Sequence, residues 1–265
     1  MIDIHSHILP GLDDGSKSVE DTLGIVRQLR KAGFETLLAT PHVLEGTDFL
    51  HPEEILSATE QVRQAVTEAG IPVEILPGAE NYIFPDLAKW VRAGKLLTLG
   101  NTGKYILVEL PMLEIPYYTE QVFFELQVLG ITPVLAHPER NRGLAEEPER
   151  ILEWAKKGIL FQLNLRSLSG HYGSQARQLA EIMLNSDLSH VIGSDAHRLS
   201  GSELTYVDGL QRVKEIVGET RYFDLTRGNP QTILEGKPLL GDREYFLKGL
   251  SSKKRENRFW NLFRR

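Results

Sequence analysis

Short runs of aliphatic and β-branched residues alternate along the chain with longer segments in which apolar residues recur every three to four positions. Short apolar runs bounded by turn residues are typical of buried strands, and the longer period is typical of amphipathic helices. Strands are predicted within residues 2–7, 34–42, 72–80, 105–110, 131–137, 159–164 and 190–197. Helices are predicted over residues 18–33, 52–70, 118–130, 147–158, 174–187 and 202–218, with a shorter one near 86–93.

Residues at the ends of the predicted helices support these boundaries. Ser18 followed by Asp21 resembles a capping box, and glycines stand where helices commonly end, at Gly33, Gly70, Gly130 and Gly158. Strands that are mostly followed by helices predict a parallel sheet with helical crossovers. Because the 265 residues contain no Pro/Ser-rich linker, we predict a single α/β barrel of about seven β/α units. A doubly wound open sheet is the alternative.

Composition excludes several classes of protein. The chain has no cysteine, which excludes disulfides, thiolate metal sites and a cysteine nucleophile. Its first residues, MIDIHSH, lack the basic and apolar regions of a signal peptide, and no apolar run approaches the ~20 residues of a membrane-spanning helix. We therefore expect a cytoplasmic protein. The net charge of −6 argues against general binding to nucleic acid.

Acidic and imidazole side chains occur where the predicted strands end. His5 and His7 end the first run, and Asp195 and His197 end the last. Residues two apart on a strand share a face, so each pair presents two ligands to one point. The intervening positions are His42, Glu80, Glu109 and His137, with Asp13 and Asp14 in the loop after the first strand. The carboxyl ends of parallel barrel strands meet at the face that carries the active site, so these groups are expected to converge.

Five imidazoles and four carboxylates are too many ligands for one ion. The nine residues suit two or three divalent ions with carboxylates bridging them, and nitrogen and oxygen donors without sulfur suit Mn²⁺, Fe²⁺ or Zn²⁺. Adjacent ions can acidify a bound water and hold the oxygens of a phosphoryl group. The pattern therefore predicts metal-dependent hydrolysis. The other histidines, His51, His171 and His190, do not share this placement and are interpreted as structural, although the loop of His171 could overhang the site.

Six motifs occur in one order along the chain: HSHILPGLDDGS at the start, ATPH (39–42), PGAE (77–80), VEL (108–110), LAHPER (135–140) and GSDAH (193–197). In these motifs the chain resembles the PHP (polymerase and histidinol phosphatase) superfamily, and within it the bacterial CpsB/CapC-type, or YwqE-like, protein tyrosine phosphatases. The resemblance extends from residue 1 to about 240. It implies a distorted (β/α)7 barrel over residues 1–245, followed by a basic and aromatic tail over 246–265.

The resemblance also implies a trinuclear metal centre, assigned most often as manganese or iron. His5 and His7 would hold one ion with Asp195. Glu80 would bridge this ion to a second, held by Glu109 and His137. The third would be held by Asp14, His42 and His197. Arg140 matches the phosphate-binding arginine of the family, and Arg198 is a second candidate for substrate contact. The catalytic residues implied are Arg140, His42 and Asp14.

The implied reaction is hydrolysis of phosphotyrosine on a protein, expected to be a bacterial tyrosine kinase that controls capsule or exopolysaccharide synthesis. A metal-bridging hydroxide would attack phosphorus in line, while the ions and Arg140 neutralise charge on the phosphoryl oxygens. Two alternatives stay open: a small-molecule phosphatase of the histidinol phosphate type, and a non-catalytic, metal-stabilised binding module. An amidohydrolase, which also begins with H-x-H, would typically need a bridging lysine and would lack the arginine of LAHPER.

The C-terminal segment 253–265 differs in charge from the rest of the chain. It holds six Lys/Arg against one Glu, a net charge of +5, so the preceding residues carry −11. Four apolar residues lie among these cations: Phe259, Trp260, Leu262 and Phe263. Basic residues interleaved with aromatic ones are typical of segments that bind anionic membranes at their surface. We therefore predict peripheral contact of this tail with the inner membrane or a partner; a disordered solubilising tail and packing on the barrel are the alternatives.

Overall fold

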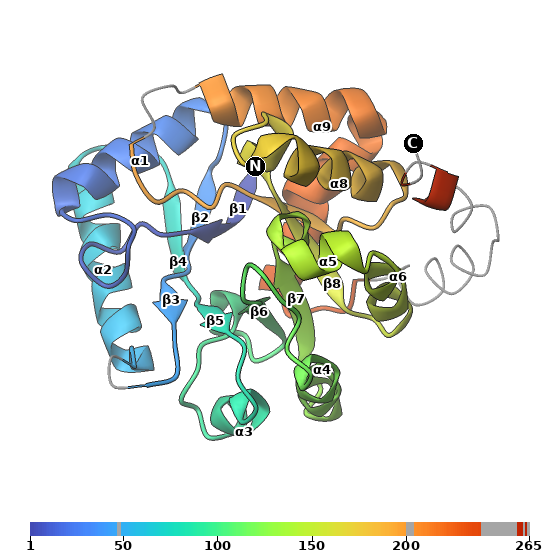
Figure 1. The fold of residues 1–265 in the computed structure, drawn as a ribbon. Helices are drawn as coiled ribbons and strands as arrows, with labels where there is room; N and C mark the ends of the chain where they lie inside the picture. The colour runs from blue at the N-terminus through green and yellow to red at the C-terminus, as the bar shows by residue number, and fades with distance from the viewer. Residues whose placement is uncertain (47–48, 200–203, 240–258, 262, 264–265) are drawn as a thin grey trace.

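The computed structural model describes residues 1–46, 49–199, 204–239, 259–261 and 263 (Figure 1). Its strands pair in parallel throughout and form two sheets. The first has the order β1 (Ile2–Ser6), β2 (Thr36–Ala39), β4 (Glu74–Pro77). The second has the order β3 (His42–Val43), β5 (Glu80–Tyr82), β6 (Tyr105–Glu109), β7 (Thr132–Ala136), β8 (Leu160–Asn164), β9 (Val191–Gly193). The fold is the predicted distorted α/β barrel.

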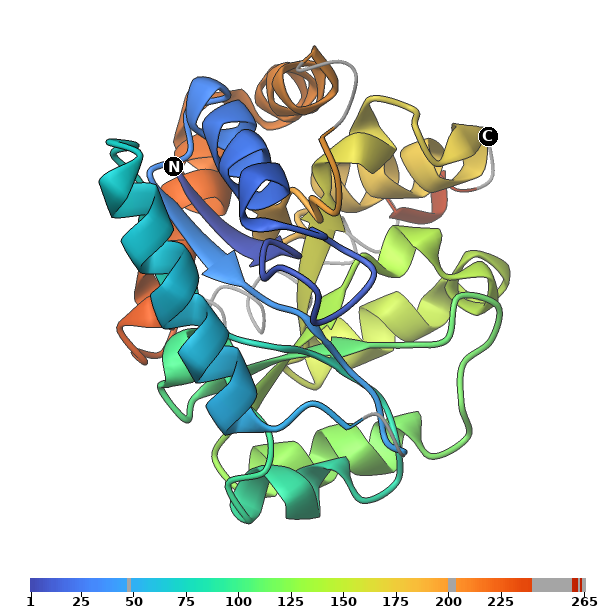
Figure 2. The ribbon, with the colours of Figure 1, turned by 90° about the vertical axis from the view of Figure 1, so that its left-hand side faces the viewer.

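Helices cover the outside of the curled sheets (Figures 1 and 2). They are α1 (Val19–Lys31), α2 (Pro52–Glu68), α3 (Leu87–Arg92), α4 (Thr119–Val128), α5 (Arg142–Glu146), α6 (Glu149–Lys156), α7 (Leu165–Leu168), α8 (Gly173–Asn185), α9 (Leu204–Phe223) and α10 (Asn229–Leu234). Short turns of other helix types occupy Leu99–Asn101, Pro138–Arg140 and Asp224–Gly228. Ser18 caps α1 as predicted, since its hydroxyl accepts the N–H of Asp21 at 3.2 Å.

Two predicted strands are each divided in two, because prolines interrupt them. The run 34–42 becomes β2 and β3 around Pro41, and the run 72–80 becomes β4 and β5 beyond Pro77. Proline has no N–H to donate to a neighbouring strand, so it ends regular pairing. The chain therefore leaves the first sheet and enters the second, where His42 and Glu80 are paired neighbours.

The first and second sheets also meet along β1 and β9. Ser6 and Ala196 form an isolated parallel bridge, the N–H of His7 donates to Ala196 O at 2.9 Å, and the N–H of Asp195 donates to His5 O at 2.9 Å. Two ligand-bearing segments from opposite ends of the sequence are thereby joined through their backbones.

An apolar cluster occupies the barrel, and it includes Ile4, Leu38, Leu107, Val134 and Val191. A larger cluster lies between the sheets and the surrounding helices and contains residues of α1, α2, α4, α6 and α8. On β6, Leu107 and Glu109 are two residues apart and share a face, so the barrel lining changes from apolar to ionisable toward the carboxyl ends of the strands. This change places the candidate site on the face predicted.

The C-terminal aromatic residues pack on the protein. Phe259 is fully buried in the larger cluster, and Trp260 and Phe263 pack against it while partly buried. Both views place this segment beside α8 (Figures 1 and 2). Packing on the barrel, one of the alternatives for this segment, therefore holds for Phe259, whose buried ring is not available to a lipid surface. Residues 253–258 and the predicted domain boundary between 245 and 246 lie outside the described residues. None of the helices among the described residues is long and apolar enough to cross a membrane.

Candidate metal centre

Two imidazoles and two carboxylates, from His5, His7, Glu80 and Asp195, lie close together inside the barrel. The Nε2 atoms of His5 and His7 lie 3.0 Å apart. Glu80 Oε2 lies 3.1 Å and 3.3 Å from these two nitrogens. Asp195 Oδ1 lies 3.4 Å and 3.3 Å from them. Ligands bound at ~2.0–2.2 Å lie about 2.8–3.6 Å from one another around an octahedral or tetrahedral ion. The spacing of His5, His7 and Glu80 therefore fits one cation, and Asp195 adjoins the two imidazoles.

A second group shares Glu80 with the first. His42 Nδ1 lies 3.0 Å from Glu80 Oε2 and 3.3 Å from Glu109 Oε2. His137 Nε2 lies 3.0 Å from Glu80 Oε1 and 3.7 Å from Glu109 Oε1. Each oxygen of Glu80 thus faces a different set of imidazoles. A carboxylate in this position is suited to bridge two cations.

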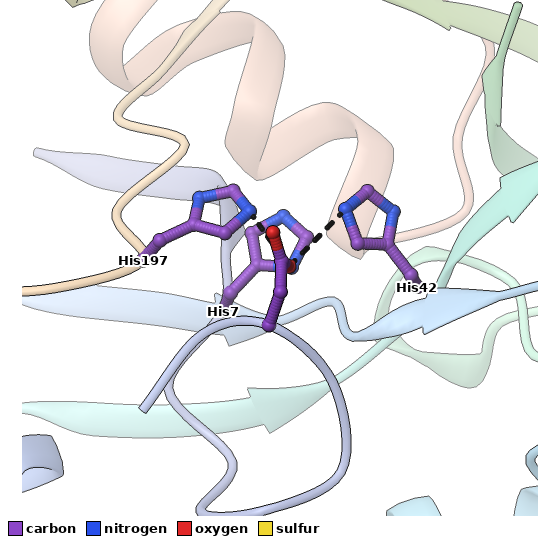
Figure 3. A group of neighbouring side chains, drawn as sticks. His7, His42 and His197 are labelled. Atoms are coloured by element: carbon purple, nitrogen blue, oxygen red, sulfur yellow. Dashed lines mark ion pairs between the residues drawn. The ribbon is translucent and has the colours of Figure 1, made fainter. Parts of the chain in front are cut away.

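A third group lies toward solvent and consists of His7, Asp14, His42 and His197. Figure 3 shows the three imidazoles facing one another across a small space. Asp14 Oδ1 lies 3.6 Å from His42 Nε2 and 3.3 Å from His197 Nε2. The side chain of Asp14 is 66% exposed, and those of His42 and His197 are about one-fifth exposed. This group therefore forms the open side of the site.

The structure brings all nine predicted ligands together, with one difference from the expected grouping. His7 and His42 each lie in two groups rather than one. His7 contacts the first and third groups, and His42 contacts the second and third. The three groups are therefore continuous, and adjacent ions would share ligands.

The polar interactions of Glu80 test whether the residues fit a cation. Glu80 Oε2 is buried and accepts no hydrogen bond from the described residues, although imidazole nitrogens of His5, His7 and His42 surround it at 3.0–3.3 Å. A buried carboxylate oxygen without a hydrogen bond is costly unless a charge compensates it. Divalent ions with nitrogen and oxygen ligands satisfy this condition, so the donor set fits the metal that the pattern predicts.

The protein alone compensates these charges with protons. Burial lowers the pKa of His42, but Glu109 and Glu80 beside the ring outweigh it and raise that pKa to about 10. Burial raises the pKa of Asp195, but the charge of His5 and the hydrogen bond from His7 hold it well below its usual range. Protonated imidazoles thus supply the positive charge that bound metal ions would supply.

Two further residues orient the ligands from behind. His5 Nδ1 lies 2.8 Å from Gln162 Oε1, and His7 Nδ1 lies 2.7 Å from Asp13 Oδ2. Such partners of metal-binding histidines fix the ring orientation and the tautomer. The only signal of Gln162 in the sequence is that it is a polar residue inside the apolar run ILFQLN. For Asp13 the sequence predicts only a position in the loop after the first strand.

Two ligands have left-handed backbone conformations, with φ of 29° at His137 and 51° at Asp195. Residues with a Cβ adopt such conformations at a cost of ~1–3 kcal/mol, and strain of this kind clusters at functional sites. His137 directly follows β7 and Asp195 lies two residues beyond β9, and each turns its side chain into the cluster. Nothing in the sequence marks these two positions as strained.

The two predicted substrate contacts lie in different parts of the site. Arg140 Nη1 donates to Asp195 Oδ2 at 2.5 Å, and the Arg140 guanidinium carbon lies 4.1 Å from the centre of the Tyr172 ring. Arg198 lines a cavity of ≈ 400 Å³ beside His197, together with Lys17 and Leu199. Arg140 therefore adjoins the inner two groups of side chains, whereas Arg198 adjoins the outer group.

The three histidines interpreted as structural lie outside the cluster. His51 precedes α2 and caps it, and the ring nitrogen Nδ1 of buried His190 accepts the N–H of Phe161 at 3.1 Å. His171 is exposed, and its Nε2 lies 2.6 Å from Nη2 of Arg166. Its loop nevertheless places Tyr172 against the site.

Comparison with protein families places these residues in a known context. The family model described as "Capsular polysaccharide synthesis, CpsB/CapC" matches residues 1–235. The chain is 34% identical over 239 residues to the tyrosine-protein phosphatase YwqE of Bacillus subtilis (strain 168), which covers 90% of this chain and 93% of that protein. It is 30% identical over 239 residues to the tyrosine-protein phosphatase CpsB of Streptococcus pneumoniae, with 88% and 98% covered.

Solved structures agree with this context. One, from a study of YwqE from Bacillus subtilis and CpsB from Streptococcus pneumoniae as metal-dependent tyrosine phosphatases, superposes with a TM-score of 0.86 at 32% identity. It covers 91% of this chain and 96% of that chain. A histidinol phosphate phosphatase from Lactococcus lactis superposes with a TM-score of 0.54 at 15% identity, covering 81% and 93%. The latter likeness concerns the fold alone.

Proposed function

Since this chain belongs to the CpsB/CapC family of capsular polysaccharide synthesis, we propose that it is a metal-dependent protein tyrosine phosphatase, a phosphoric monoester hydrolase. The observation that carries this proposal is the convergence of nine nitrogen and oxygen ligands beside the Arg140 guanidinium. When bound, divalent ions supply Lewis-acid activation of water and of phosphoryl oxygens. The absence of cysteine from the chain excludes the thiol-based route to phosphotyrosine hydrolysis.

The ligand assignment is part of the proposal. His5, His7, Glu80 and Asp195 would hold the innermost ion. Glu80, Glu109 and His137 would hold the second, with His42 beside them. Asp14, His42 and His197 would hold the third, with His7 beside them. Two to three ions would be bound, most favourably Mn²⁺, with Fe²⁺ and Zn²⁺ as the alternatives that the same donor atoms permit.

Arg140 is proposed to bind the phosphoryl group. Its guanidinium is held at one end by Asp195 and is one-fifth exposed, so it has donors left for a ligand. A planar guanidinium matches two phosphoryl oxygens with parallel hydrogen bonds and neutralises their charge. Because Asp195 also faces the innermost ligands through its other oxygen, it links the position of Arg140 to the metal centre.

The leaving group is proposed to depart on the open side of the site, where His42 and Asp14 lie. A phenol has a pKa of ~10, so tyrosine leaves as phenolate with less need of a proton than an alkoxide would have. His42 Nδ1 lies 3.0 Å and 3.3 Å from the inner carboxylates of Glu80 and Glu109, and its Nε2 lies 3.6 Å from Asp14 on the open side, so His42 is placed to stabilise the departing oxygen.

Arg198 is proposed to contact the peptide around the phosphotyrosine. With Lys17 it gives one wall of the cavity beside His197 a positive charge. Lys17 Nζ also donates to the backbone oxygen of Asp13 at 2.8 Å, which holds it next to the ligand loop. An acidic residue beside the phosphotyrosine would be attracted to this pair.

The physiological substrate is proposed to be a tyrosine kinase that controls capsule or exopolysaccharide synthesis, and the location is proposed to be the cytoplasm. Peripheral contact of residues 253–265 with an anionic membrane would depend on their basic residues, since Phe259 is buried. Salt-sensitive binding to anionic vesicles that is lost on deleting 253–265 would support that contact. Binding unchanged by the deletion would reject it.

Metal analysis and phosphatase assays on the same preparation test the main proposal. Hydrolysis of a phosphotyrosyl peptide should disappear on chelation and return with Mn²⁺, Fe²⁺ or Zn²⁺, and it should exceed hydrolysis of histidinol phosphate. Glu80→Gln should reduce activity by more than the ~10–100-fold loss that is typical when a hydrogen-bond partner of a metal ligand is mutated. Glu74→Gln is the matched control, since Glu74 is an exposed carboxylate in the same sequence run. Full activity of Glu80→Gln, or of metal-free protein, would refute the proposal.

A further inference from the structure

The loop between α7 and α8 places an aromatic ring against the predicted phosphate-binding arginine. Gly170 and Gly173 have φ of 83° and 90°, which bends the chain sharply on either side of His171 and Tyr172. Between these bends the Tyr172 ring lies 4.1 Å from the Arg140 guanidinium carbon. Tyr172 is partly buried, whereas its neighbour His171 is exposed. The loop therefore directs Tyr172 inward and His171 outward.

Arg140 is restrained in two different ways. Its edge donates to Asp195 Oδ2, an oxygen that also accepts from Asn164 Nδ2 at 2.7 Å. Its guanidinium carbon also lies over the Tyr172 ring. A guanidinium fixed only by one hydrogen bond can still rotate about that bond, whereas a second contact with a packed ring limits that rotation. The two contacts together define the direction in which the remaining donors point.

A second cation lies beside the same ring. The Arg166 guanidinium carbon is 5.7 Å from the ring centre, and Arg166 Nη2 is held by His171 at 2.6 Å. Partial burial lowers the pKa of His171, and the positive charges of Arg166 and Arg140 lower it further. Tyr172 thus packs against the cation of Arg140 while Arg166 is retained by the neighbouring histidine. The Tyr172 ring therefore packs against Arg140 in a region where two positive charges lie close together.

We propose that Tyr172 is a positioning residue for phosphate binding, which holds the Arg140 guanidinium plane in place before the phosphoryl group arrives. The inference rests on the proposed function, in which Arg140 binds that group. Pre-organising a side chain lowers the entropy that binding would otherwise lose. Cation–π contacts contribute ~0.5–2 kcal/mol according to their burial, so losing the ring should weaken phosphate binding by about 2–30-fold.

The test compares Tyr172→Leu with Tyr172→Phe in full-length, metal-loaded protein. The readouts are kcat and KM for a phosphotyrosyl peptide, the inhibition constant of inorganic phosphate, and the metal content. Tyr172→Leu should raise KM and the phosphate inhibition constant by the same factor, within the 2–30-fold range, and leave the metal content unchanged. Tyr172→Phe, which keeps the ring, should restore both constants. Phe124→Leu, which replaces a 60% exposed ring on α4 in the same way, is the matched control and should change neither.

The Arg140→Met background separates this inference from the proposed function. If Arg140→Met leaves phosphate inhibition unchanged, the assigned role of Arg140 is wrong and the inference fails with it. If Arg140→Met weakens inhibition but Tyr172→Leu does not, only the inference fails. Tyr172→Leu should have no additional effect in the Arg140→Met protein, and an equal additional loss there would overturn the positioning role. Failure of Tyr172→Phe to restore binding would overturn it too.

Discussion

The Nε2 atoms of His5 and His7 lie 3.0 Å apart inside the barrel, and each ring is held from behind by an oxygen. Gln162 Oε1 can only accept, and so can the ionised Asp13 carboxylate, so each imidazole donates its Nδ1–H outward. In that tautomer both Nε2 atoms direct a lone pair toward the same point. Two lone pairs at this separation repel unless a proton or a cation lies between them.

We expect bound metal to stabilise the fold strongly, because coordination bonds replace the protons that otherwise keep these nitrogens from repelling each other. A ligand present at 1,000 times its dissociation constant stabilises the native state by ~4 kcal/mol per site. Thermal unfolding should therefore shift to higher temperature on adding Mn²⁺ to chelator-treated protein. His5→Asn should show a smaller shift, and equal shifts in the two proteins would contradict this prediction.

Asp13→Ala should weaken metal binding although Asp13 is not assigned as a ligand. The carboxylate accepts from His7 Nδ1 and from the backbone N–H groups of Gly15 and His42, so it fixes both a ring and the loop around it. Loss of such a partner typically reduces metal affinity by ~10–100-fold. Competition with a coloured chelator measures the change. Asp86→Ala, which removes a surface carboxylate paired with Lys89, should retain native affinity.

His190 should make the protein less stable in mild acid. Burial, with the charge of Arg221 added, lowers the pKa of this histidine to about 3. Below about pH 6.5 this histidine takes up a proton in the unfolded chain but not in the folded one. The free energy of unfolding therefore decreases by up to ~1.4 kcal/mol for each unit by which the pH is lowered, until about pH 3. Above pH 6.5 the group contributes no pH dependence.

Urea unfolding of wild type and His190→Asn between pH 4 and 8 measures this slope. Asparagine keeps an acceptor near the Phe161 N–H but does not titrate, so its stability profile should be flatter below pH 6. Parallel profiles would assign the acid sensitivity to other groups.

Phe259→Ala should destabilise the protein even though the residue lies in the C-terminal tail. The ring is fully buried in the larger core cluster, and truncating a buried phenylalanine costs ~3–5 kcal/mol. Phe124→Ala is the matched control, because that ring is 60% exposed on α4 and should change stability by about 0.5 kcal/mol or less. Denaturation midpoints that agree for wild type and Phe259→Ala would show that the tail leaves the core in solution.

Most of the ligand positions could be predicted because they lie at or just beyond the end of a predicted strand, where sequence periodicity is informative. His5, Glu109 and Asp195 are examples, and parallel strands bring such ends to one face whatever the details of the sheet. Asp14 lies in a loop, and His42 and Glu80 begin short strands of their own. The division of two strands at Pro41 and Pro77 was not predicted, although the prolines are visible, because the apolar runs continue across them.

Other features depend on contacts that a single sequence does not encode locally. Gln162 reaches His5 from a strand 157 residues away, and the stacking of Tyr172 on Arg140 depends on how a short loop bends. The burial of Phe259 could not be inferred from its basic neighbours, because a segment rich in basic residues is expected to be solvated. The space that holds the ring is formed only by the folded protein. In each case tertiary packing decided the outcome.

The centre also has a mechanical consequence for the barrel. His5 and His7 belong to or directly follow β1 of the first sheet, while His42, Glu80 and Glu109 belong to the second. Ions held between these residues would connect the two sheets along the line where they meet. Their removal should loosen that line before the rest of the molecule, so amide exchange near Ser6 and Ala196 would report metal release ahead of global unfolding.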